Sequence, residues 1–241
     1  MRTVQAWPTE WTPGSFLDRL SAPTREALLA IGTRRQFESG HRILREGDRD
    51  SHVELLIRGF VKVTTLVEGI EALMAIRMPG DIVGETASLT GRARTATVTA
   101  CGRVTSSVVK KAAFHSFLVR HPDAAVHMAA TVTERLRWAN LRRAEFTAYP
   151  AEVRLARMLV DLAETCGRAT DDGITIAASI SQPELASMVG IADATAQKAI
   201  RDMRTNGLIR TGYRRITIVD LAALRTLGEG GDGPPPEDDR D

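Results

Sequence analysis

Two short runs of residues carry the chemistry needed to bind a phosphate and a ribose. The run Gly84-Glu85-Thr86-Ala87 predicts the start of a short helix, whose free backbone N–H groups can donate hydrogen bonds to a phosphate. Further along the chain, Arg94 can add a charge-assisted, bidentate hydrogen bond and Thr95 a hydroxyl group. Glu85 is a suitable acceptor for a ribose 2′-OH, a role that an acid also has in dinucleotide-binding folds. These residue types therefore predict a nucleotide site.

The same residues also have a purely structural interpretation. Gly84-Glu85 can form a turn with a surface acid, and Arg94 can pair with an acidic neighbour. Because a short motif is a hypothesis about binding, the sequence leaves both interpretations open.

A second group of residues, between 181 and 219, predicts a DNA-binding element. Ser181-Gln182-Pro183-Glu184 has the spacing of a capping box, in which a hydroxyl and a carboxylate satisfy free N–H groups at the start of a helix. Gly190 supplies a sharp turn, and a second helix is expected at about Asp193–Thr205. A basic hairpin follows, with strands at Leu208–Arg210 and Arg215–Val219 around Thr211–Arg214. This order predicts a winged helix-turn-helix.

The outer face of the second helix and the hairpin carry side chains suited to DNA. Gln197 can pair with adenine, and Lys198 can reach a base edge or a phosphate. The arginines suit phosphates, which would make the affinity salt-dependent. The predicted DNA-contacting residues are Ser181, Gln182, Asp193, Thr195, Gln197, Lys198, Arg201, Arg204, Arg214 and Arg215. Any one of these cations alone could be solvated surface, whereas the ordered set favours DNA binding.

About residues 16–226 resemble the Crp/Fnr family of bacterial transcription regulators. The likeness rests on Ile180–Gly190, on Gly84-Glu85 with Arg94-Thr95-Ala96-Thr97-Val98, and on a segment of short strands separated by glycines. The resemblance implies a homodimer, joined through the helix at residues 122–147, that binds double-stranded DNA at two-fold related half-sites.

The predicted recognition helix departs from the family pattern. Ala192-Asp193-Ala194-Thr195 stands where the family usually has Ser-Arg-Glu-Thr, and Lys198 stands at a usual arginine position. The family's operator sequence is therefore not carried over to this chain. Asp193 can cap the helix instead.

The resemblance also implies an effector. The segment from Gly84 to Thr95 looks like the phosphate-binding cassette of cyclic-nucleotide domains, and cyclic AMP is the leading candidate. In the family, purine contacts come partly from the central helix, where Asn140 can bond the base edge and Ala139 cannot. A constitutive regulator with a degenerate roll, or one that responds to another small molecule, is the alternative. Iron–sulfur and haem sensing are disfavoured, because the two cysteines form no cluster and the five histidines are scattered.

These residues must be positioned by an α+β fold. After an arm at 1–15, short β-rich runs separated by glycines predict an antiparallel β-roll within a sensor domain at 16–118. Residues 119–148 form a central helix with a heptad-like apolar stripe, which favours dimerisation over packing on its own domain. The stripe consists of Ala125, Ala129, Val132, Leu136, Ala139 and Phe146, and Arg143 interrupts it.

The DNA-binding domain is expected at 149–227. It opens at a Tyr149-Pro150 hinge and continues with a helix at Glu152–Glu164 and a loop at Gly167–Gly173. The tail at 228–241 is expected to be disordered. Residues 229–241 hold six acidic side chains and one basic, whereas residues 181–226 hold seven basic and four acidic. The tail could shield the basic domain, contact RNA polymerase or have no role, and the sequence leaves all three open.

Composition is that of an ordinary globular protein. The 241 residues are 43% hydrophobic and 26% charged, with a formal net charge of +2. No apolar run is long enough to span a bilayer, and the N-terminus lacks the blocks of a signal peptide. A cytoplasmic protein with no membrane partner is therefore expected. An enzyme is disfavoured, because the sequence shows no Ser/His/Asp arrangement, Walker loop or metal-ligand cluster.

Overall fold

The computed structural model describes residues 11–230, and the chain divides into one unit that ends at Asn140 and a second that begins at Leu141. The dividing point lies inside the longest helix, α5 (Pro122–Ala148), so the predicted segment 119–148 is shared between the units. Residues 1–10 of the predicted arm and 231–241 of the predicted tail lie outside the described residues. Within residues 11–230, no helix combines the length and apolar character that crossing a bilayer requires.

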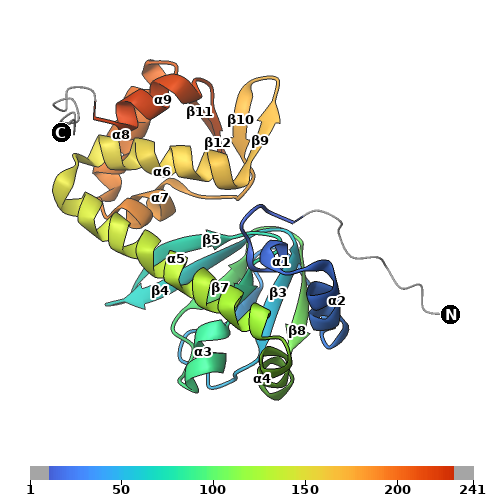
Figure 1. Ribbon diagram of the computed structural model, residues 1–241. Helices are drawn as coiled ribbons and strands as arrows, with labels where there is room; N and C mark the ends of the chain where they lie inside the picture. Colours follow the sequence, from blue (N-terminus) through green and yellow to red (C-terminus); the bar gives the residue numbers. More distant parts are fainter. Residues whose placement is uncertain (1–10, 231–241) are drawn as a thin grey trace, which may run out of the picture. The chain divides into compact units, whose positions relative to one another are not determined.

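The first unit is an antiparallel β-roll, as the glycine-separated strands predict (Figure 1). Its strands are β1 (Thr33–Phe37), β2 (Arg42–Leu44), β3 (Val53–Arg58), β4 (Val61–Val67), β5 (Ile70–Arg77), β6 (Ile82–Val83), β7 (Thr97–Ala100) and β8 (Val104–Val109). They form two four-stranded sheets with the orders β1-β8-β3-β6 and β2-β7-β4-β5. The β4–β5 hairpin closes through Glu68 and Gly69, both with positive φ, as a tight two-residue turn requires.

Helices cover one face of the first sheet. They are α1 (Phe16–Arg19), α2 (Ala22–Ala30), α4 (Lys111–Arg120) and the beginning of α5, while the short α3 (Glu85–Thr90) follows β6. Successive residues of a strand point to opposite faces, so β3 serves two cores. Leu55 packs in a core with Phe114 and Phe117 of α4, whereas Leu56 packs with Val61 and residues of the opposite sheet. This double burial explains the consecutive apolar residues Leu55-Leu56-Ile57.

The second unit is a helix-turn-helix with a small sheet. It contains the end of α5, α6 (Ala151–Cys166), β9 (Gly167–Thr170), β10 (Gly173–Ile176), α7 (Gln182–Val189), α8 (Asp193–Thr205), β11 (Ile209–Gly212), β12 (Arg215–Ile218) and α9 (Leu221–Gly228). The strand order is β11-β12-β10-β9. The amphipathic α6 buries Leu155 and Leu159 against this unit. The break predicted at Tyr149-Pro150 is confirmed, since α5 ends at Ala148 and α6 begins at Ala151.

The prediction of a loop at Gly167–Gly173 is wrong. These residues form strand β9, a turn and the start of β10. The reason is a long-range pairing, in which Ile174 of β10 lies opposite Ile218 of β12 and extends the wing sheet. The polar run Gly167–Thr170 then pairs along the other edge of β10. No local apolar alternation marks such a strand.

Candidate ligand-binding and DNA-binding sites

A cavity of about 340 Å³ lies in the first unit beside α3. This volume is within the range of small-molecule sites. Six of the predicted ligand-binding residues line it, namely Gly84, Glu85, Thr86, Ala87, Arg94 and Thr95. Asn140, the seventh, does not; the cavity meets α5 at Val132, Arg135 and Leu136.

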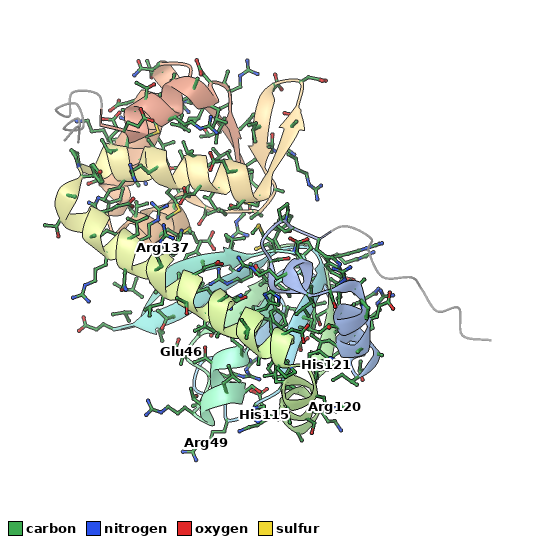
Figure 2. The ribbon with its side chains drawn as sticks, viewed as in Figure 1. Glu46, Arg49, His115, Arg120, His121 and Arg137 are labelled. Atoms are coloured by element: carbon green, nitrogen blue, oxygen red, sulfur yellow. The ribbon has the colours of Figure 1, made fainter. Side chains whose placement is uncertain are left out.

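The short helix predicted at Glu85 is confirmed as α3, and Gly84 is its N-cap residue with a φ of +83°. A Cβ on Gly84 would lie 2.4 Å from Nη1 of Arg94 and 2.9 Å from the carbonyl oxygen of His52. Only glycine therefore lets the Arg94 side chain pass so close to the start of α3. On its other side, α3 is held by His115 of α4, whose Nε2 lies 3.0 Å from the Ser88 carbonyl oxygen (Figure 2).

Arg94 is buried, and its guanidinium bonds to its own surroundings. Nε donates to Asp50 Oδ1 at 2.6 Å, Nη1 to the Gly84 carbonyl at 2.8 Å and Nη2 to the His52 carbonyl at 2.7 Å. The acidic pairing that the sequence left open is thus present. Arg94 joins the loop before β3 to the start of α3.

That loop is fixed in turn by Glu46 (Figure 2). The Glu46 carboxylate accepts hydrogen bonds from the Thr65 hydroxyl and the Leu66 N–H of β4, both at 3.0 Å. The partners of Arg94 therefore belong to a segment that is tied to the roll, and not to a free loop.

Glu85 is paired with an arginine that sequence reasoning missed. Its Oε1 accepts a hydrogen bond from Nη1 of Arg135 at 2.7 Å, and Nη2 of Arg135 donates to the Ile82 carbonyl at 2.9 Å. Among the described residues, none donates to Oε2 of Glu85. The sequence did hold an indication that Arg135 belongs to the site, because Arg135 lies between Val132 and Leu136 of the apolar stripe on α5.

A third arginine of the cavity wall, Arg77, was also missed. It is the last residue of β5 and lies opposite Val61, a core residue of β4. Burial and the positive charge of Arg135 lower the pKa of Arg77 to about 10, while Asp81 and Glu85 act in the opposite direction. Within the described chain, its guanidinium makes no hydrogen bond or ion pair. A β-bulge at Met74 interrupts the alternation along β5, so the sequence pattern alone does not place Arg77 at the cavity.

In the second unit, the capping box and the glycine turn are confirmed. The Ser181 hydroxyl accepts a hydrogen bond from the Glu184 N–H at 3.4 Å, and the Glu184 carboxylate accepts one from the Ser181 N–H at 2.7 Å. Gly190 ends α7 with a φ of +62°. Both Ser181 and Gln182 are half-buried, and the Ser181 side chain is engaged in the cap.

Helix α8 has the predicted bounds and presents one polar face to solvent. Asp193, Thr195, Gln197, Lys198, Arg201 and Arg204 are exposed, as are Arg214 and Arg215 of the hairpin. Among residues 11–230, none of the five cations on this surface (Lys198, Arg201, Arg204, Arg214, Arg215) has an ion-pair partner. By contrast, Arg210 is neutralised by Asp172 at 2.5 Å.

Two details of the winged helix-turn-helix differ from the sequence-based prediction. Asp193 does not cap α8, because Ala192 is the N-cap residue and Asp193 is the first residue of the helix. The turn of the wing is also shorter than predicted, since β11 continues to Gly212 and leaves Tyr213 and Arg214 as the tip. Tyr213 is 94% exposed there, and sequence reasoning did not single it out.

The predicted dimer stripe on α5 presents large apolar side chains to solvent. Val132 and Leu136 are 40% and 59% exposed, so they remain available for packing. Phe146 is 45% exposed, and its ring also lies 3.1 Å from the position of a Cβ on Gly190 and 5.3 Å from the Arg154 guanidinium carbon. The stripe therefore keeps exposed apolar side chains on both sides of Leu141.

Known proteins match both parts of the chain. Residues 34–121 match the cyclic nucleotide-binding domain family, and residues 153–227 match the Crp-like helix-turn-helix domain family. The transcriptional regulator LdrP of Thermus thermophilus is 30% identical over 194 residues, which span 79% of this chain and 94% of LdrP.

Two further similarities each cover most of this chain. A CRP-like cAMP-activated global transcriptional regulator of Mycobacterium tuberculosis is 26% identical over 189 residues, spanning 78% of this chain and 84% of the relative. The crystal structure of a CRP-family transcriptional regulator from Thermus thermophilus superposes with a TM-score of 0.69 at 26% identity, covering 81% of this chain and 96% of that one.

Proposed function

This chain belongs to the Crp/Fnr family of transcription regulators, and from that membership we propose that it is a homodimer whose β-roll binds a cyclic nucleotide and whose winged helix-turn-helix binds DNA. Its relatives and its fold are those of transcription regulators rather than of enzymes. The observation that carries the proposal is the exposed polar face of α8 and the wing, with its five unpaired cations.

DNA docking follows from the position of these side chains. A helix held across α7 can enter the major groove and present Gln197 and Lys198 to base edges. Arg214 and Arg215 on the wing suit phosphates of the backbone. Since no carboxylate neutralises these cations within the described chain, their full charge is available to displace counterions from DNA.

The cavity fits a small anionic nucleotide. Leu44, Val98 and Leu136 supply apolar wall for a base, and the free Oε2 of Glu85 can accept a hydrogen bond from a ribose hydroxyl. Arginines supply positive charge for a phosphate. A bound cyclic nucleotide would contribute negative charge and apolar surface to this cavity, and cyclic AMP is the leading candidate.

Ligand binding would act on DNA binding through α5. Val132 and Leu136 line the cavity and are also the exposed apolar residues of the expected dimer face. A ligand that contacts them more favourably in one arrangement of the two helices shifts the dimer toward that arrangement.

A constitutive regulator is the second candidate, and one observation favours it. Without any ligand, the Arg94 guanidinium donates hydrogen bonds to Asp50, Gly84 and His52. The donors that would hold a phosphate are therefore already used within the protein. In that case the roll has a structural role only, and DNA affinity is independent of nucleotide.

Recovery of genomic DNA fragments by the purified protein, with and without cyclic AMP, tests the proposal. We expect inverted repeats with half-sites about one helical turn apart, enriched further by cyclic AMP. Lys198→Ala should weaken recovery, whereas Arg120→Ala, which removes an exposed cation of α4 in the first unit (Figure 2), should not.

The experiment can refute DNA binding, the dimer or the response to cyclic AMP separately. No enrichment under either condition would exclude DNA binding, and recovered sites without two-fold symmetry would exclude the dimer. Equal enrichment with and without cyclic AMP would support the constitutive regulator.

A further inference from the structure

We propose that protonation of His52 controls effector binding in the β-roll cavity, and that it does so by acting on Arg94. This inference rests on the proposed function, with the phosphate of a cyclic nucleotide at the start of α3 beside Arg94. His52 does not line the cavity, so it is a positioning residue that changes the charge and the hydrogen bonds around Arg94. The affinity for the effector is expected to rise as the pH falls.

The imidazole of His52 lies between two carboxylates. Nδ1 is 3.2 Å from Oδ2 of Asp50, and Nε2 is 3.4 Å from Oε1 of Glu54. The ring can donate to both carboxylates only when both of its nitrogens carry a proton. The third charged group at the ring is Arg94, whose Nη2 lies 3.4 Å from Nδ1. Among residues 11–230, these three are the charged groups in contact with the His52 ring.

Glu54 is a carboxylate in the interior of the roll. Its side chain is fully buried on β3, and its Oε2 accepts a hydrogen bond from the Ser106 hydroxyl of β8. Within the described chain, Oε1 accepts no hydrogen bond, and its ion-pair partner is Nε2 of His52. A buried carboxylate is costly unless a cation pairs with it. Glu54 therefore gives the protonated ring a specific partner on its Nε2 side, which leaves Nδ1 directed at the partners of the cavity arginine.

The proton on Nδ1 decides how firmly Asp50 holds Arg94. Without that proton, Nδ1 can accept a hydrogen bond from Nη2 of Arg94, and Asp50 keeps Nε of Arg94 as its donor at 2.6 Å. With the proton, Nδ1 donates to Asp50 instead, so the carboxylate is shared between two cations. A shared carboxylate binds Arg94 less tightly. The guanidinium can then exchange Asp50 for the phosphate of an effector.

The charge of the cluster changes in the same direction. Asp50 and Glu54 carry two negative charges, and Arg94 carries one positive charge, so the cluster has a net charge of −1 when His52 is neutral and zero when it is protonated. A phosphodiester anion is repelled less by the neutral cluster. Coupling between the proton and the anion is reciprocal, so binding of the effector takes up protons.

Isothermal titration calorimetry on the full-length protein, with cyclic AMP as the probe, tests the proposal. Histidine is the side chain that ordinarily changes charge between about pH 5 and 8, so titrations at about pH 6 and about pH 8 compare the two states of the ring. A full charge a few ångströms from the anion should strengthen binding by the parent about tenfold at the lower pH. The phosphodiester keeps its single negative charge at both values.

His52→Gln removes the titrating group and keeps a polar side chain. We expect this variant to bind cyclic AMP as the parent does at about pH 8 and to gain nothing at about pH 6. His41→Gln is the matched control, because His41 is an exposed histidine of the same unit outside the cavity wall, and it should keep the profile of the parent. Equal weakening of His52→Gln at both pH values would mean that His52 only supports the fold, and would overturn the proposal.

Two further measurements do not depend on His52→Gln being folded. Titration of the parent at about pH 7 in HEPES and in Tris, which differ in ionisation enthalpy, counts the protons exchanged, and we expect an uptake of up to about one proton per site. Glu54→Gln keeps the shape of the side chain but removes one of the two carboxylates at the ring. Its gain in affinity should therefore begin at a lower pH than in the parent, and an unchanged profile would remove Glu54 from the proposal.

The outcomes separate this inference from the proposed function. Binding of cyclic AMP with the same affinity at both pH values and without proton uptake overturns the role of His52 and leaves the effector standing. The same pH dependence in His52→Gln as in the parent also overturns it. Absence of cyclic AMP binding to the parent at either pH overturns both the inference and the cyclic nucleotide.

Discussion

Replacing Glu145 by alanine should destabilise the second unit far more than replacing Glu164 by alanine. Glu145 accepts hydrogen bonds from Nη1 of Arg142 at 2.7 Å and from Nε of Arg157 at 2.8 Å. Glu164 accepts one from Nη2 of Arg225 at 2.8 Å. The bond lengths are similar, but the Glu145 side chain is 4% exposed and that of Glu164 is 50% exposed.

Burial sets the size of the difference. Removing one partner of a buried ion pair costs about 3–5 kcal/mol, because the other charge is left without compensation, whereas an exposed pair contributes about 0–1 kcal/mol. Burial lowers the pKa of Arg142 below its ordinary value, and Glu145 partly offsets this effect. Asp161 also pairs with Arg142 and stays in place, which puts the expected loss near the lower value, about 3 kcal/mol.

Hydrogen exchange on the full-length protein measures this loss within the affected unit. A loss of about 3 kcal/mol accelerates exchange of the most protected α6 amides about 100-fold, whereas Glu164→Ala should accelerate it by less than about fivefold. Amides of β3 and β8 in the first unit serve as the internal reference. If both variants accelerate exchange equally, burial does not govern these ion pairs and the reasoning is refuted.

Three other substitutions have defined outcomes. Gly190→Ala should cost about 1–3 kcal/mol in urea denaturation, since φ is +62° and the new Cβ meets the Phe146 ring; an unchanged midpoint would contradict this. Lys198→Ala should reduce the log–log salt slope of DNA binding by about one, measured by fluorescence anisotropy, and an unchanged slope would remove Lys198 from the phosphate contacts. Despite some desolvation, hydrogen bonds from Thr24 and the backbone hold the pKa of Asp123 below its ordinary value, so its carboxylate stabilises the fold above about pH 4. The melting-temperature advantage of the parent over Asp123→Asn should therefore be present at neutral pH and disappear as the pH falls below that value.

The sequence predicts best where interactions are local. The capping box, the turn at Gly190 and the bounds of α8 depend on residues a few positions apart, and all three are confirmed. The bonds of Arg94 were not predictable in detail, because Asp50 and His52 are brought to it by the folding of the roll.

Long-range pairing explains the remaining differences. Strand β9 exists because β10 pairs with β12, and the cavity wall includes Arg77 because β5 lies beside β4. The stripe on α5 places Arg135 near the cavity, whereas a β-bulge at Met74 interrupts the alternation along β5, so the place of Arg77 in the cavity wall is seen only in the folded chain.

The two helices of the DNA-binding element begin in different ways. Helix α7 starts with a closed capping box, whereas α8, which begins at Asp193 after the N-cap residue Ala192, has no side-chain cap. Loss of a cap weakens the first turn of a helix, so the start of α8 frays more readily in the free protein. A DNA phosphate can accept hydrogen bonds from the same N–H groups. On the proposed docking, such a contact would complete the start of α8, and the entropy lost in ordering that turn would become part of the affinity for each operator.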